Sequence, residues 1–447
     1  MKVRSELLTT GNALDPLPGW RSLVRLLSRG PVLACADQAV VSATSFLTLI
    51  LVARWNGAEQ LGLFAIGLSV VGVTLAVQHS LVSLPYAVQR HRPPGSAGEH
   101  AYCCLLHSGL FSASVAGLLV LAALGLSAAG AHPESVHTAW ALAALMPLAA
   151  TKEFAREFAL ARLDWHRALV VDLVAAAIQL SAIVWLGLAG LLSPFTAYAA
   201  MGVSCGLAAL GWLCLSRSDF AFRLGQLRTT LRQNWELGKW LFLSRSALLV
   251  QGYSTYWLSM FLAGAAATGV YAACMSIVAF ANPVLLGLYN FLVPNAVLAW
   301  KDGGTAGLRK RAAGDALLLG AALGCFFVLV LFAGEQVMQL LYPGEAFEGH
   351  GLTLAVLTLG TLIAGLAIPA SNALTSMERP RPLAAIAGVS AILNVALVWW
   401  LIGEWGLLGA AIGIVAANLV GMLGRWAIFL ALTRSPSNPV PTAPQEQ

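Results

Sequence analysis

Residues 316–333 read ALLLGAALGCFFVLVLFA, eighteen consecutive residues without a charged side chain. An α-helix of this length rises about 27 Å, which is close to the ~30 Å thickness of the hydrocarbon layer of a bilayer. Apolar stretches of this kind recur from residue 31 to residue 433. They predict an all-α membrane protein with about twelve transmembrane helices. The expected spans are 32–53, 61–88, 101–129, 136–159, 168–190, 194–216, 239–263, 268–299, 313–334, 351–377, 383–403 and 407–433.

The composition excludes a soluble protein. Of the 447 residues, 58% are hydrophobic and only 10% are charged, and the mean hydropathy is +0.77. Soluble domains carry roughly a quarter charged residues. All seven cysteines lie in apolar stretches, without the spacing of a disulfide framework or of a metal site, so neither is expected. The net charge of +6 does not predict a nucleic-acid partner, because the topology accounts for where the basic residues lie.

The basic residues mark one side of the membrane. Of the 26 lysines and arginines, 23 fall in the leader, the tail and the alternate loops that would share one side. The positive-inside rule assigns that side to the cytoplasm. The remaining three are Arg54, Arg245 and Arg425. Because the number of spans is even, we expect both termini in the cytoplasm. We expect the membrane to be a bacterial inner membrane.

The two halves of the chain resemble each other. A shift of 214 residues superposes Arg167 on Arg381 and Trp185 on Trp399, and the tetrapeptide 62–65 (GLFA) matches 269–272 (GVYA). Halves of six helices share one orientation, which predicts two parallel-repeat bundles with a cleft between them. The expected organisation is a cytoplasmic leader at 1–31 with an amphipathic segment, six-helix bundles at 32–216 and 239–433, a cytoplasmic linker at 217–238 that either lies on the membrane surface or is solvated, and a tail at 434–447.

Ionisable groups inside the spans are the candidate substrate-binding residues, since a charge in lipid is costly unless it faces a cavity or a partner. Arg245 lies early in the seventh span and is the first candidate for a cationic cavity residue. Asp37 and Gln38 lie at a comparable depth in the first span. An ion pair between Asp37 and Arg245 across the cleft is the structural alternative to a binding role.

Further candidates lie near the span ends. Arg425 is about two turns from the end of the last span and either assists binding or extends to the surface. Arg54 either closes the outer exit or anchors its helix. The segment 152–157 (KEFARE) favours a network of ion pairs along one helix. Pro85 and Pro294 occupy nearly matching positions in the two halves and are candidate gating residues, although packing kinks would look the same.

Three segments carry a resemblance to a known family. Residues 36–46 (ADQAVVSATSF) and 53–64 (ARWNGAEQLGLF) resemble the opening of polysaccharide and O-antigen repeat-unit flippases. Residues 154–165 (FAREFALARLDW) resemble the fourth-helix region of the same proteins. These flippases belong to the multidrug/oligosaccharidyl-lipid/polysaccharide (MOP) exporter superfamily, and the plan of twelve spans agrees with theirs along essentially the whole chain.

The resemblance implies a fold and a function. The fold is the V-shaped pair of bundles that the superfamily shares with the multidrug exporters of the MATE type. The function is the movement of a polyprenyl-pyrophosphate-linked oligosaccharide from the inner to the outer leaflet, in company with membrane lipids, a glycan polymerase and export machinery. Cationic cavity residues hold the pyrophosphate in relatives, a role that here would fall to Arg245, with Arg54 or Arg425 assisting.

Two other functions stay open. A cation-coupled multidrug exporter on the same fold would prefer an acidic cavity, for which Asp37 is weak support. A membrane glycan polymerase or ligase would need a large catalytic outer loop, and the best candidate, residues 335–350, is short. The sequence contains no nucleotide-binding loop, dinucleotide fingerprint, metal-binding pair or nucleophile elbow, so no enzyme activity and no cofactor are expected.

Overall fold

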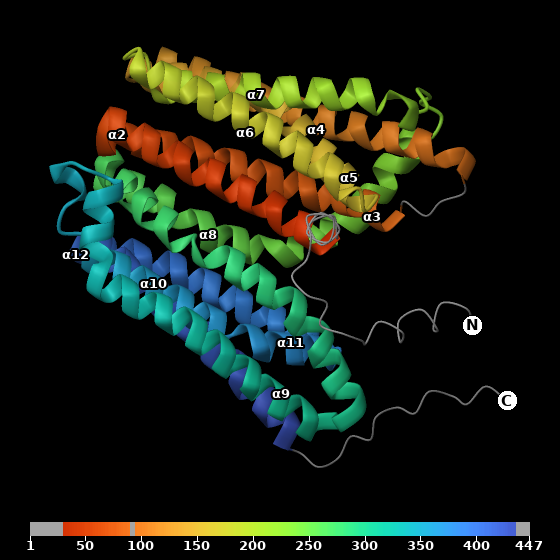
Figure 1. Ribbon diagram of the computed structural model, residues 1–447, viewed down its shortest axis with the longest axis vertical. Coiled ribbons are helices and arrows are strands. Elements are labelled where there is room, and N and C mark those ends of the chain that lie inside the picture. The colour runs from red at the N-terminus through yellow and green to blue at the C-terminus, as the bar shows by residue number, and fades with distance from the viewer. Residues whose placement is uncertain (1–29, 90–93, 435–447) are drawn as a thin grey trace, which may run out of the picture.

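The computed structural model describes residues 30–89 and 94–434, and within these ranges the regular structure is entirely helical (Figure 1). The expected leader and tail therefore lie almost wholly outside the described residues. The elements are α2 (Gly30–Gln78), the π-helix η1 (His79–Ser83), α3 (Leu84–Gln89), α4 (Pro94–Ala128), α5 (Pro133–Ala161), α6 (Trp165–Leu188), α7 (Pro194–Leu215), η2 (Arg217–Asp219), α8 (Leu227–Val278), α9 (Ala281–Leu341), η3 (Glu345–Phe347), α10 (Gly351–Leu366), α11 (Ile368–Ser376) and α12 (Pro380–Arg434).

Four of these helices are too long to be single crossings, and each contains a sharp kink. The kinks lie at Gly57, Gly264, Gly304 and Gly406, with φ of 78°, 86°, 56° and 58°. This left-handed region suits glycine, which has no Cβ to clash. Division at the kinks gives the twelve crossings predicted from the sequence: 30–56, 58–89, 94–128, 133–161, 165–188, 194–215, 227–263, 265–303, 305–341, 351–376, 380–405 and 407–434. Within residues 30–89 and 94–434, eight helical stretches, some of them kinked, are long and apolar enough to span a bilayer, so the chain is a multi-pass membrane protein.

The crossings form two bundles. The first contains α2 to α7 and the second contains α8 to α12, and their main contact is between α2 and α8. In Figure 1 the bundles converge at the end that contains the kinks at Gly57 and Gly264, and they splay apart toward the end where α2 begins and α12 ends. We call these the convergent end and the splayed end.

Matching glycines confirm the internal repeat at the convergent end. The kinks at Gly57 and Gly264 are 207 residues apart, the same shift that aligns Gly62 with Gly269. A Cβ on Gly62 would overlap the carbonyl group of Ala265, and a Cβ on Gly269 would overlap that of Ala58. Since Ala58 and Ala265 are also 207 residues apart, the two contacts are equivalent. Both helices therefore cross with their backbones touching, on a pseudo-two-fold axis.

A hydrophobic core surrounds this crossing. It joins buried residues of α2, such as Leu61 and Phe64, to buried residues of α8, such as Val270 and Ala273. Phe347 of η3 belongs to the same core, so the loop after α9 covers it. The two bundles are thus sealed together at the convergent end by continuous apolar packing.

The linker differs from the expected one. Helix α8 begins at Leu227, twelve residues before the predicted start of the seventh span, and runs without a break into the membrane segment. Its first turns are fixed to α4, where the side chains of Thr230 and Asn234 lie within hydrogen-bonding distance of His100 and His107. These buried polar contacts dock the start of α8 onto the first bundle, which explains why the helix extends beyond the apolar stretch.

Candidate functional site

The first bundle contains a network of ion pairs centred on Arg156 of α5. Its guanidinium donates to Asp37 Oδ2 of α2 at 2.9 and 3.1 Å and lies 2.8 Å from Asp172 Oδ2 of α6. Contacts of 3.2 and 3.7 Å join it to Glu153 and Glu157 on its own helix. Arg156 therefore ties three transmembrane helices together, and the network predicted for residues 152–157 is confirmed and extends beyond α5.

Two more groups complete this network. Lys152 forms an ion pair with Asp172, and His79 Nδ1 of η1 lies 3.3 Å from Glu157. The permanent charges are four carboxylates against two cations, so the network has an acidic excess before histidine protonation is counted. Each carboxylate faces a basic partner, and the described residues include no group of three or more acidic, histidine or cysteine side chains arranged to hold a metal ion. Its members are Asp37, His79, Lys152, Glu153, Arg156, Glu157 and Asp172.

The predicted pair between Asp37 and Arg245 is not formed. Asp37 is 2% exposed and its partner is Arg156, which reaches it from within the same bundle. Arg245 lies exposed on α8, close enough to Glu157 for the two charges to interact. It therefore faces the first bundle from the second, at the level of the ion-pair network. The structure leaves the Arg245 guanidinium free of any hydrogen bond among the described residues.

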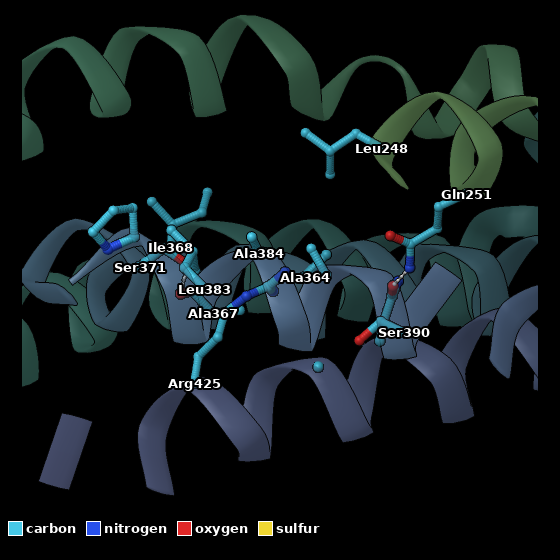
Figure 2. A pocket seen from close by; sticks show the side chains of 14 residues that line it. Leu248, Gln251, Ala364, Ala367, Ile368, Ser371, Leu383, Ala384, Ser390 and Arg425 are labelled. Carbon is cyan, nitrogen blue, oxygen red and sulfur yellow. Dashed lines mark hydrogen bonds between the residues drawn. The ribbon is translucent and has the colours of Figure 1, made fainter. Parts of the chain in front are cut away.

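The second bundle contains a cavity of about 460 Å³ with Arg425 on its wall (Figure 2). Figure 2 shows the Arg425 side chain extending from α12 into this space, toward Ala364 and Ala384. Among the described residues Arg425 has no ion-pair partner, and its Nε is buried without a hydrogen bond. None of the described residues that line the cavity is acidic. The lining residues are Leu248, Gln251, Ala364, Ala367, Ile368, Ser371, Pro380, Leu383, Ala384, Ala387, Ser390, Asn418, Gly421 and Arg425.

Polar groups position the far wall of this cavity. Gln251 of α8 donates to Asn418 Oδ1 of α12 at 2.8 Å, and Asn418 donates in turn to the carbonyl of Gly360 at 3.0 Å. The hydroxyl of Ser390 lines the cavity without a hydrogen-bond partner among the described residues. A partly buried cation without a counter-ion is costly unless a mobile anion or water compensates it. The Arg425 cavity is therefore suited to an anion with additional hydrogen-bond acceptors.

Arg54 lies at the convergent end and connects the two bundles. Its Nε and Nη2 donate to the carbonyl oxygens of Leu341 and Leu340, at 3.0 and 2.5 Å. These carbonyls belong to the last turn of α9, where backbone acceptors lack helical partners and a cation is favoured. This contact joins α2 to the end of α9, and both roles considered for Arg54, closure of the exit and anchoring of its helix, stay predictions.

The structure does not decide the roles predicted for Gln38, Pro85 and Pro294. The amide of Gln38 donates to Ser42 on the same helix at 3.3 Å. Pro85 is buried in α3, directly after the π-helix η1, whereas Pro294 is exposed within the regular helix α9. The two prolines thus have unlike surroundings despite their matching sequence positions, and their gating role stays a prediction.

Sequence reasoning missed Asp172, Gln251 and Asn418. Asp172 interrupts the apolar run of α6 and could have been found by the rule that singled out Arg245. Gln251 and Asn418 carry no charge, and their pairing across 167 residues is visible only in the structure.

Comparison with known proteins bears on the fold. No family model and no curated protein matches the sequence. An inward-facing multidrug resistance MATE family transporter of the MOP superfamily superposes with a TM-score of 0.72 at 15% identity, over 89% of this chain and 96% of that one. The lipid II flippase MurJ, in an inward closed conformation, superposes with a TM-score of 0.65 at 12% identity, over 90% of each chain.

The chain has the fold of the MOP superfamily transporters. An outward-facing MATE family transporter gives a TM-score of 0.64 at 15% identity, over 90% of this chain and 94% of that one. Since the MOP fold carries both multidrug transporters and a lipid flippase, the residues of the cavities must decide between these functions.

Proposed function

We propose that this protein is an alternating-access flippase that moves a polyprenyl-pyrophosphate-linked oligosaccharide from the cytoplasmic to the periplasmic leaflet of a bacterial inner membrane. The observation that carries the proposal is Arg425, an unpaired cation in a cavity of about 460 Å³ whose described lining includes no acidic residue. A multidrug exporter of cationic compounds would be poorly served by this cavity. A pyrophosphate supplies both the counter-charge and the acceptors that the cavity lacks.

Topology supports the same direction of transport. Both described chain ends lie at the splayed end, which the positive-inside rule places in the cytoplasm. Arg245 and the Arg425 cavity would then open toward the leaflet where lipid-linked precursors are made. Outward movement of two negative charges is favoured by an inside-negative potential, by about 4.6 kcal/mol per 100 mV. No bound cofactor and no catalytic step are needed, and a glycan polymerase and export machinery would use the product.

The second candidate function is a cation-coupled multidrug exporter. One observation favours it, namely the acidic excess of the ion-pair network around Arg156. The carboxylates and His79 of that network could accept a coupling proton in either function. The two functions therefore differ in what the second bundle binds, and not in the presence of acidic groups in the first.

Gene deletion tests the proposal directly. Leaflet distribution of lipid-linked oligosaccharide and tolerance to cationic drugs are measured in the same strain. Precursor trapped in the inner leaflet with unchanged drug tolerance supports the flippase, and normal precursor distribution with increased drug sensitivity refutes it. Rescue with Arg425→Gln should fail, whereas the exposed Arg379→Gln on the loop before α12 should restore flipping, with equal membrane levels of both variants.

A further inference from the structure

A second hollow, of about 510 Å³, lies between α8 and α12. Its residues are mainly small or apolar, and Val250 and Ile392 at its edges are 46% and 73% exposed. No residue of the lining is charged. On a membrane protein such an open apolar surface faces lipid, so the hollow forms a groove for hydrocarbon. The lining is Ser246, Ala247, Val250, Gly388, Ala391, Ile392, Val395 and Ala396.

This groove and the Arg425 cavity lie on two sides of one seam. Leu248 and Gln251 of α8 line the cavity, and their neighbours Ala247 and Val250 line the groove. Ala387 and Ser390 of α12 line the cavity, and the next residues, Gly388 and Ala391, line the groove. Figure 2 shows the cavity side of the seam, where Leu248 and Gln251 lie across the pocket from Ala384 and Ser390.

The seam is closed firmly in only one of its halves. Toward the convergent end, Asn394 donates to Ser254 at 3.3 Å, and the rings of Phe261 and Trp399 stack at 5.8 Å. Toward the splayed end, no hydrogen bond or ring contact joins residues 245–251 to 383–391 among the described residues. Six of the nine residues of α12 there are alanine, glycine or serine. Gln251 bonds instead to Asn418 in the crossing 407–434. Separation of residues 245–250 from residues 383–391 would therefore break van der Waals contacts and no hydrogen bond between described residues.

We propose that this half of the seam between α8 and α12 is the lateral entry for a lipid substrate, with the anionic head at Arg425 and the hydrocarbon chain in the groove. The inference rests on the proposed function. It adds the route by which the lipid head enters the protein while the hydrocarbon chain of the substrate stays in the bilayer. The Arg425 cavity supplies a cation and hydrogen-bonding groups for the head, whereas the uncharged groove keeps the polyprenyl chain in lipid. The cavity and the groove share one wall, so a single molecule with an anionic head and a hydrocarbon chain can occupy both. A free anion would leave the groove empty, and a partner helix would leave the cavity empty.

Gly388 allows a sharp test, because a Cβ built there has nothing within 4 Å. The variant Gly388→Phe adds an aromatic ring to the groove at a position where the Cβ meets no neighbour. Gly403 on the same helix is equally open and lies outside the groove, so Gly403→Phe is the matched control. Binding of polyprenyl pyrophosphate and of inorganic pyrophosphate is measured for full-length protein in nanodiscs of phosphatidylethanolamine and phosphatidylglycerol, together with its oligomeric state.

We expect Gly388→Phe to weaken binding of polyprenyl pyrophosphate at least tenfold and to leave inorganic pyrophosphate unaffected, with no change for Gly403→Phe. Arg425→Gln should weaken binding of both probes. If Gly388→Phe binds polyprenyl pyrophosphate normally while Arg425→Gln does not, the lateral entry is refuted and the flippase proposal survives. Equal loss of both probes in Gly388→Phe, or a changed oligomeric state with normal lipid binding, also refutes the entry. If wild-type protein binds neither probe, both proposals fall.

Discussion

The contact between α2 and α8 at the convergent end predicts that two glycines act as equivalent parts of one gate. A Cβ on Gly62 would lie 2.7 Å from the carbonyl carbon of Ala265, and one on Gly269 would lie 2.8 Å from that of Ala58. Carbon atoms prefer about 3.5–4.0 Å, so Gly62→Ala or Gly269→Ala must separate the helices by about 1 Å. Overpacking of this kind costs about 1–3 kcal/mol, which shifts a two-state equilibrium about 5- to 150-fold toward separated bundles.

The shift can be measured as a distance across the gate. Glu59 and Ala266 are exposed and are related by the same 207-residue shift, so a spin label on each reports separation symmetrically. The exposed cysteines Cys35, Cys214 and Cys325 are first replaced by serine. We expect both single glycine variants to enlarge the population with the longer label distance.

The pseudo-two-fold axis sharpens this prediction. Gly62→Ala and Gly269→Ala should have similar effects, and the double variant should add little, because either Cβ already separates the same pair of helices. Gly252→Ala, at an exposed position on α8 with open space around it, is the control and should leave the distances unchanged. Folded glycine variants with wild-type distances, or a strong effect at only one glycine, would refute the symmetric crossing.

Two further changes probe the contacts between helices. Arg54→Gln should favour separation of the same labels by about 1 kcal/mol, since the Leu340 and Leu341 carbonyls lose a charged donor; unchanged distances would show that this contact does not hold the exit. Arg156→Met should lower the free energy of unfolding by about 3–5 kcal/mol, because it leaves Asp37 buried without its cation and leaves Asp172 with Lys152 alone. Thermal unfolding in detergent measures it, and removal of the exposed Arg232 is the control; equal melting temperatures for the Arg156 variant and wild type would contradict a stabilising role.

The sequence predicted the transmembrane helices well because each crossing is a local property. A stretch of eighteen residues without a charged side chain can cross the bilayer whichever helices surround it. A stretch such as 316–333 could therefore be assigned without knowledge of the helices that pack against it. The short match of 62–65 to 269–272 supported the internal repeat, and the structure adds that both segments lie where the backbones of α2 and α8 touch, which leaves no room for a Cβ at either glycine.

The partners of the charged residues could not be predicted in the same way. Asp37 was considered with Arg245, but in the structure three helices bring Arg156 to it. The helix rotations that decide this depend on packing among many small residues, for which an apolar sequence has almost no periodic signal. For the same reason Asp172 was not recognised as part of the network.

The amino-acid sequence by itself determined that this chain crosses a membrane about twelve times, in two related halves, with its basic loops on one side. Hydrophobic length and charge placement are sums over neighbouring residues, and no tertiary contact alters them. Only the tertiary structure decided that Arg156 is neutralised by Asp37 and Asp172 while Arg425 stands unpaired beside a cavity. Whether a buried charge is compensated depends on atoms far apart in the chain, and the packing of the helices alone brings them together.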